Sequence, residues 1–298
     1  MTEPVASTPL LLLRAMRPRQ WTKNVLLLAG LFFSRSLLDP VAIGRALAGL
    51  VIFCLLSGAI YLINDVTDAP MDRLHPSKRH RPIASGRLSS RLALHAALLL
   101  IVLGFVGSYA LSVHFLICSA AYVLMMISYT LLLKLVFLID ALMIAMGFVI
   151  RAVSGVIVLR TPQTPVPLTS WFIVCVMFLS LFLAFAKRRS ERVRLDREGW
   201  STRPVLGQYS PELLDRMITV CCAGAILSYT LYSTTVDTPW MMMTTLPFVL
   251  FGIFRYLHLV YNTDDGEAPE VTLTRDPPLL GCIALWLVSL VVVYLPAG

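Results

Sequence analysis

The hydrophobic pattern of this 298-residue chain consists of long apolar runs separated by short polar segments. A helix needs about 20 mostly apolar residues to cross the hydrocarbon core of a bilayer. Such segments are expected at 25–38, 43–63, 92–111, 113–133, 137–158, 168–187, 216–234, 240–261 and 277–296, the first being short. The pattern predicts an all-α bundle of about nine transmembrane helices. No low-complexity linker divides it, so residues 1–298 are expected to form a single integral-membrane domain.

The positive charges predict which side of the membrane each loop occupies. If the N-terminus is cytoplasmic, most of the 25 lysines and arginines fall in cytoplasmic segments, and only Arg35, Arg45 and Arg160 fall outside. Cytoplasmic loops of membrane proteins carry such an excess of positive charge. Of the acidic residues, only Asp39 and Asp237 are placed outside. Acidic residues contribute little to membrane orientation, so the orientation rule does not explain why they lie on the same side. Their clustering there indicates a polar functional surface at the cytoplasmic side.

Composition supports a membrane protein and argues against two other classes. The chain is 57% hydrophobic and 14% charged, whereas a soluble domain has about 25% charged residues. The net charge of +8 does not indicate nucleic-acid binding, because the basic residues lie in short loops where membrane orientation explains them. The six cysteines lie in apolar runs without a CxxC pair, which favours small buried side chains over metal ligands.

An acidic cluster follows the second apolar run. At about 100° per residue, Asp65, Asp68 and Asp72 share one helix face, with Asn64 at its edge. Carboxylates this close repel one another unless a cation lies among them. Their hard oxygen ligands suit Mg²⁺, with Mn²⁺ as the alternative, so the three are predicted to be catalytic metal ligands. The simpler alternative is a solvated helix end paired with nearby cations.

A basic run follows the acidic cluster. Pro70 and Pro76 are expected to interrupt the helix, since proline lacks a backbone donor, and the chain should bend into a loop after Asp72. That bend should bring Lys78, Arg79 and Arg81 back over the acidic face. A metal together with Lys and Arg is what binding of a diphosphate requires.

Two further basic segments are candidate phosphate sites. At the inner end of the sixth span, Lys187, Arg188 and Glu191 share a helix face through their spacing. The opening run from Arg17 to Lys23 surrounds a tryptophan. Orientation in the membrane would explain the first segment equally well, and anchoring on anionic lipid would explain the second.

Polar residues within and between the middle spans are also candidates. Tyr129, Lys134 and Asp140 lie in and around the tight loop between the fourth and fifth spans. Arg151 lies near the middle of the fifth span, where a charged side chain needs a partner or a water-filled cavity. We expect it to face the bundle interior, either as a substrate contact or as a structural pair. Arg255 has the same ambiguity.

The motif Asn64-Asp65-x-x-Asp68-x-x-x-Asp72 resembles the UbiA-type intramembrane prenyltransferase superfamily. Additional stretches are similar to its members that transfer phosphoribose to a polyprenyl phosphate, and the resemblance covers essentially the whole chain. These stretches are RPRQWTKN, YLINDVTDAPMDRLHPSKRHRPIASG, Arg151–Gly155, the segment ending in AKRRSE, and the loop Glu267–Asp276.

Two positions depart from the patterns of these families. Ring-prenylating members usually carry a second DxxxD-type motif, where this chain has Lys187-Arg188-x-x-Glu191. Two cations in place of an acid suit two separate phosphate-bearing substrates better than one metal-clamped prenyl diphosphate. Asp140 stands where the proteins of closest resemblance carry Glu, which leaves its role open.

The resemblance implies an Mg²⁺-dependent pentosyltransferase. The donor would be 5-phosphoribosyl diphosphate, the acceptor a polyprenyl (decaprenyl) phosphate and the leaving group pyrophosphate, in a step toward arabinose-containing cell-envelope polymers. The protein would be a multi-pass protein of the bacterial inner membrane, with homo-oligomers left open. Its site would lie at the cytoplasmic face, on loops 64–91, 187–215 and 262–276.

Two other functions are compatible with the sequence. The alternative enzyme would move a polyprenyl group from its diphosphate to an aromatic acceptor, and the missing second acidic motif argues against it. A transporter would explain many spans and an intramembrane arginine. Transport sites, however, tend to lie near the bilayer midplane between repeated halves, whereas here the polar residues gather at one face.

Overall fold

The computed structural model describes residues 7–34, 36–160, 169–198, 204–236, 238–262 and 275–294, and every regular element within them is helical. The first half contains α1 (Thr8–Ala15), η1 (Pro18–Leu28), α2 (Ala29–Phe33), α3 (Pro40–Leu74), η2 (Lys78–His80), α4 (Ser90–Leu111), α5 (Val113–Leu131) and η3 (Leu133–Leu135). The second half contains α6 (Ile139–Ile157), α7 (Ser170–Glu198), η4 (Pro204–Gln208), α8 (Pro211–Thr235), α9 (Pro239–Met243), α10 (Leu246–Asn262) and α12 (Pro277–Tyr294). The elements labelled η are 3₁₀ helices.

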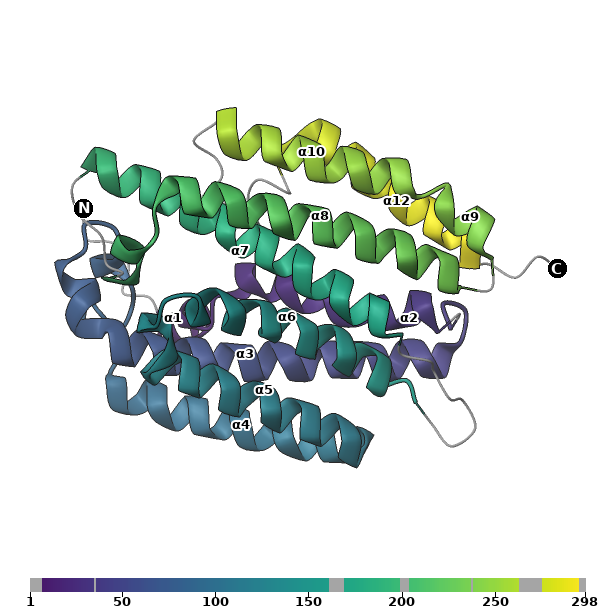
Figure 1. The fold of residues 1–298 in the computed structure, drawn as a ribbon. Coiled ribbons are helices and arrows are strands. Elements are labelled where there is room, and N and C mark those ends of the chain that lie inside the picture. Colours follow the sequence, from purple (N-terminus) through teal and green to yellow (C-terminus); the bar gives the residue numbers. More distant parts are fainter. Residues whose placement is uncertain are drawn as a thin grey trace.

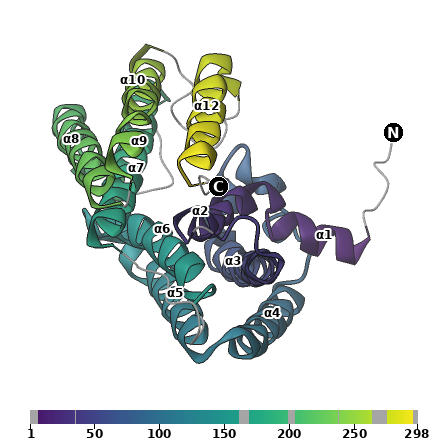
Figure 2. The same cartoon turned by 90° about the vertical axis from the view of Figure 1, so that its right-hand side faces the viewer.

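The long helices run side by side along one axis, and neighbours in sequence are neighbours in space (Figure 1). Seen end on, they follow a curve from α4 through α5, α6, α7 and α8 to α10 and α12 (Figure 2). The curve turns back on itself, because α12 contacts α2 near the start of the chain. This arrangement places α3 and η1 against the inner faces of α5 and α6.

Eight helices in the described residues are long and apolar enough to cross a membrane, so the protein is a multi-pass membrane protein. They correspond to eight of the nine predicted spans. The short predicted segment 25–38 instead contains the end of η1 and the five-residue helix α2. The count of nine and the cytoplasmic N-terminus therefore stay predictions.

Local sequence signals set where several helices begin. The Asp39 carboxylate accepts the Val41 N–H at 2.9 Å, with Pro40 at the first helical position of α3. Ser112 caps α5 by accepting the Phe115 N–H at 3.1 Å. Ser210 caps α8 in the same way. Such caps satisfy backbone donors that have no partner inside the helix.

The expected interruption of the helix at Pro70 is wrong. Helix α3 continues through Pro70 and ends at Leu74. A proline costs one backbone hydrogen bond, and here it lies in the last turns of a 35-residue helix. The predicted bend after Asp72 is present, because the chain leaves the helix at His75 and turns into η2.

Small residues let the N-terminal segment press against α6. A Cβ atom built on Gly155 would lie 2.0 Å from the Leu27 carbonyl oxygen, and one on Gly30 would lie 2.2 Å from the Gly155 oxygen. Glycine at such crossings allows backbones to approach closely within a membrane. All six cysteines are free; Cys54, Cys221, Cys222 and Cys282 are buried, as predicted, and Cys118 and Cys175 are half-buried.

Candidate active site

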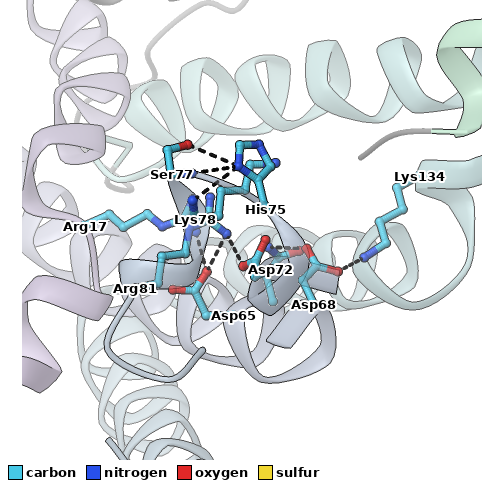
Figure 3. A network of polar contacts seen from close by, with 10 residues as sticks. Arg17, Asp65, Asp68, Asp72, His75, Ser77, Lys78, Arg81 and Lys134 are labelled. Carbon is cyan, nitrogen blue, oxygen red and sulfur yellow. Dashed lines mark hydrogen bonds and ion pairs between the residues drawn. The ribbon is translucent and has the colours of Figure 1, made fainter. Parts of the chain in front are cut away.

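The acidic face of α3 lies at one end of the bundle, and cations from three other segments converge on it (Figure 3). Asp65 and Asp72 are buried, with 2% and 3% of their surface exposed. Asp68 keeps 30% of its side chain accessible. The three carboxylates therefore share a face, as the helical spacing predicts, but differ in their access to solvent.

Arg81 connects the two buried carboxylates. Its Nη1 atom lies 2.5 Å from the Asp72 Oδ2 and 3.4 Å from the Asp65 Oδ1. Arg17 reaches the same Asp65 oxygen from the N-terminal segment and lies over the ring of Tyr61, 5.1 Å from its centroid. The loop after α3 does return over the acidic face, as expected, and the opening basic run joins it.

Asp68 has its own partners. The Lys134 ammonium donates to Oδ1 at 2.5 Å, and the Asn64 amide donates to Oδ2 at 3.1 Å. Lys134 belongs to η3, in the turn between α5 and α6. A pairing across 66 residues thus fixes the end of α3 to that turn.

The basic loop is held by its own hydrogen bonds. His75 Nδ1 accepts the N–H groups of Ser77 and Lys78 at 3.1 and 3.3 Å, which assigns the ring proton to Nε2 in the neutral form. Lys78 lies beside the acidic face in Figure 3. Arg79 is exposed, and its Nε donates to the Nε2 of the neighbouring His80 at 3.3 Å. A place for Arg79 beside Arg81 over the carboxylates stays a prediction.

The carboxylates of α3 are also the predicted metal ligands. In the described residues, no group of three or more His, Cys, Asp or Glu side chains is placed to hold a metal ion. Mg²⁺, however, needs only one or two carboxylates and completes its shell with water and phosphate oxygens. Asp65 and Asp72 fit that demand, because one Arg81 nitrogen contacts both. Coordination of a single ion by all three carboxylates stays a prediction.

The second predicted cluster is a buried ion network rather than an open cationic patch. Arg188, only 1% exposed, donates from Nε to Asp140 at 2.7 Å and from Nη1 to Glu191 at 2.8 Å. Its Nη2 atom has no hydrogen-bond partner in the described residues. Arg189 instead turns to α8 and pairs with Asp215 at 2.6 Å. The structure thus pairs Asp140 with the KRxxE segment, which the sequence did not predict.

Three other predicted residues have fewer described contacts. Lys187, immediately before Arg188, is half-buried on α7. Tyr129 lies within electrostatic range of Arg188. Lys23 lies within η1 and is half-buried. A role for any of them in phosphate binding stays a prediction.

Arg151 faces the bundle interior, as expected, and is 6% exposed. It donates to the Asn24 side-chain oxygen at 2.8 Å, to the Tyr122 hydroxyl at 2.7 Å and to the Gly147 carbonyl at 3.0 Å. Asn24 in turn donates to the Ser57 hydroxyl at 3.1 Å. These contacts join η1, α3, α5 and α6, which favours the structural alternative for Arg151.

Two residues that hold predicted site residues in place could not be identified from the sequence. Tyr209 is buried and donates its hydroxyl to the Asp140 carboxylate at 2.6 Å. Asn24, which is fully buried, ends the RPRQWTKN run. Its position beside the predicted basic segment was the only available signal. Tyr209 follows a polar loop and carried no signal that could have found it.

The loop 262–276 lies almost wholly outside the described residues. Asp276 at its end accepts two hydrogen bonds from Arg255, at 3.1 and 2.8 Å. These bonds hold the pKa of the Asp276 carboxyl below its ordinary value. Arg255 therefore ties α10 to the start of α12.

Comparison with known proteins identifies one protein family along most of the chain. Residues 24–275 match the UbiA prenyltransferase family. The chain is 33% identical over 296 residues to "Decaprenyl-phosphate phosphoribosyltransferase" of Corynebacterium glutamicum, covering 94% of this chain and 85% of that protein. It is 31% identical over 296 residues to the Mycobacterium tuberculosis protein of the same name, covering 97% and 96%.

A solved structure shares the fold. The structure of a UbiA homolog from Archaeoglobus fulgidus bound to DMAPP and Mg²⁺ superimposes with a TM-score of 0.73, at 18% identity. The superposition covers 95% of this chain and 98% of that one. The all-helical fold, the acidic motif on α3 and the extent of the sequence match lead to one conclusion: the chain belongs to the UbiA prenyltransferase family.

Proposed function

We propose that this protein transfers 5-phosphoribose from 5-phosphoribosyl diphosphate to a polyprenyl phosphate such as decaprenyl phosphate, releasing pyrophosphate. The observation that carries the proposal is the near full-length match, at 31–33% identity, to relatives named for this activity. The acidic face of α3 with its surrounding cations supplies a site of suitable chemistry. The product would serve arabinose-containing polymers of the bacterial envelope.

The donor diphosphate would bind over the end of α3. Arg17, Arg81 and Lys134 already reach this face and would exchange part of their contact with Asp65, Asp68 and Asp72 for phosphate oxygens. Arginine suits this role because its fork donates two parallel hydrogen bonds to phosphate. Lys78 and Asn64, at the margin of the same face, would complete the polar lining.

Departure of the diphosphate leaves positive charge at the anomeric carbon and negative charge on the leaving group, as in glycoside chemistry. Mg²⁺, or Mn²⁺ in its place, when held by Asp65 and Asp72, would supply neutralisation of the leaving group. The fixed cations of Arg17, Arg81 and Lys134 would add stabilisation to the same oxygens. The acceptor phosphate is already an anion and needs no strong general base.

The acceptor would approach from the bilayer. Its prenyl tail would lie among the apolar helices, and its phosphate would reach the site near Lys187 and Lys23. Residues 1–298 would act as one domain in the bacterial inner membrane with the site at the cytoplasmic face. Arg188 would act mainly through the carboxylates that enclose it, leaving Nη2 available to a phosphate oxygen.

The second candidate is prenyl transfer to an aromatic ring. It is favoured by membership of the family and by the likeness to a homolog solved with DMAPP. The buried Arg188 argues against it, because this cation neutralises Asp140 and Glu191 where a second acidic site would be needed.

One assay separates the two candidates. Purified protein is incubated with Mg²⁺, polyprenyl phosphate and radiolabelled 5-phosphoribosyl diphosphate, and the lipid is then extracted. Label in the organic phase that disappears with EDTA and with Asp65→Asn is expected. Prenyl transfer from a polyprenyl diphosphate to an aromatic acid, without labelled lipid, would establish the second candidate instead.

A further inference from the structure

The hydroxyl of Tyr209 lies where three parts of the chain meet. Tyr209 follows η4, precedes α8 and is 1% exposed. Its hydroxyl donates to Asp140 Oδ1 at 2.6 Å and accepts the Leu138 N–H at 3.1 Å. The Arg192 Nε of α7 donates to the Tyr209 carbonyl oxygen at 3.1 Å. One side chain thus connects the segment before α8 to the α5–α6 turn and to the start of α6.

The turn that Tyr209 holds is strained. Leu138 has φ 65° and ψ −40°, a positive-φ conformation outside the allowed left-handed helical region that costs a bulky side chain free energy. Such a conformation persists only when its surroundings fix it. Here the Tyr209 hydroxyl binds the Leu138 N–H, and the Phe137 ring packs on the Tyr209 ring with 4.7 Å between centroids.

The same turn carries residues of the candidate active site. Lys134, four residues before Leu138, contacts Asp68 at 2.5 Å. Asp140, two residues after it, holds the buried Arg188 at 2.7 Å. Tyr209 therefore supports the turn that carries both Lys134, which contacts Asp68, and Asp140, which binds Arg188. Its own hydroxyl is enclosed by protein.

We propose that Tyr209 is a positioning residue that holds the α5–α6 turn so that Lys134 faces the diphosphate of the donor while Asp140 keeps its bond to the buried Arg188. The inference rests on the proposed function and deepens it. Burial, followed by the hydrogen bond to Asp140, raises the pKa of Tyr209 above its ordinary value. The hydroxyl therefore stays protonated at physiological pH and keeps both hydrogen bonds.

Tyr209→Phe tests this role because it removes only the oxygen. The Michaelis constant for 5-phosphoribosyl diphosphate is expected to rise about tenfold, because Lys134 loses its fixed approach to the donor. The Michaelis constant for polyprenyl phosphate is expected to change less than about twofold. A general loss of structure would not separate the two substrates in this way.

A double-mutant cycle with Lys134→Ala tests the route of the effect. If Tyr209 acts through the turn, Tyr209→Phe adds less than about twofold to the donor Michaelis constant once Lys134 is gone. Tyr229→Phe is the matched control. It removes another buried α8-region hydroxyl, bonded to Thr245 at 2.6 Å and to Trp286 at 3.0 Å, and should leave both Michaelis constants unchanged.

The outcomes are distinct. An unchanged donor Michaelis constant in Tyr209→Phe, or an equal effect with and without Lys134, overturns the positioning role while the proposed function stands. A wild-type protein that transfers no phosphoribose overturns the proposed function itself. If Tyr209→Phe does not fold, it is made in a Leu138→Gly background, where glycine adopts the positive φ without strain but is equally free to leave it. A donor Michaelis constant that is the same in Leu138→Gly and in the double variant overturns the role as well.

Discussion

At the scale of single residues, burial separates the three carboxylates of α3. Asp65 and Asp72 are almost fully buried and both contact Arg81. Asp68 is more exposed and pairs with Lys134 instead. The enclosed pair is where electrostatic stabilisation of a leaving group has the greatest effect, because a low-dielectric site screens charge less. The three positions of the motif are therefore not equivalent.

Asp65→Asn and Asp72→Asn are each expected to lower turnover about 100-fold or more, the usual scale for losing one preorganised electrostatic group. They should also raise the Mg²⁺ concentration needed for half-maximal rate. Turnover measured across a Mg²⁺ titration checks both effects. Asp39→Asn at the other end of α3 is the control, since asparagine caps helices as well as aspartate. Full metal-dependent turnover in either variant would refute the metal assignment.

Arg151 is expected to govern stability rather than substrate affinity. Its guanidinium bonds are all given to Asn24, Tyr122 and Gly147 inside the bundle. Arg151→Met would remove the donor to the Asn24 side-chain oxygen and to the Tyr122 hydroxyl. Each buried polar group left unsatisfied costs about 1–3 kcal/mol. A thermal melt should show a clear loss. A raised Michaelis constant without a lower melting temperature would instead place Arg151 at the substrate.

At the scale of elements, the length of α3 decides where the chemistry lies. Its 35 residues span about 52 Å at 1.5 Å each, whereas the hydrocarbon core is about 30 Å thick. The helix must therefore extend beyond the core, and the acidic motif occupies its last turns. The sequence pattern predicted the apolar part, but it placed the end of the helix too early at Pro70.

The crossing of η1 and α6 supplies a test at this scale. Gly155→Ala would bring a Cβ to 2.0 Å from the Leu27 carbonyl oxygen, so the backbones must separate. Overpacking of this kind typically costs about 1–3 kcal/mol. We expect a lower melting temperature together with reduced activity, because η1 carries the segment of Arg17. Gly44→Ala, with nothing within 4 Å of its Cβ, is the matched control and should not destabilise. A Gly155→Ala protein as stable as this control would contradict the close crossing.

At the scale of the whole molecule, sequence reasoning recovered the helices and the acidic motif because both are local patterns. Hydrophobic runs identify spans, and helical spacing places Asp65, Asp68 and Asp72 on one face. The pairings were harder, because they join distant positions. Arg151 and Asn24 lie 127 residues apart, and Tyr209 and Asp140 lie 69 apart. Only the packing of the bundle brings such residues together, so Tyr209 could not be found from its neighbours.

Orientation in the membrane is the remaining property of the whole chain. The segment after α3 carries a dense run of cations, and the segment before α3 carries few, so the site end is expected to face the cytoplasm. Cysteines introduced at exposed positions test this directly. Ser85 lies in the basic loop, and Leu38, 73% exposed, lies at the opposite end of α3.

In intact cells, a membrane-impermeant thiol reagent should label Leu38→Cys and spare Ser85→Cys. Inverted vesicles should reverse the result. The wild-type protein sets the background, because its six free cysteines lie within or between the membrane helices. The reverse pattern would place the carboxylates of α3 outside the cell. A water-soluble phosphoribosyl donor made in the cytoplasm could not reach them there, so this labelling tests the location that the proposed reaction requires.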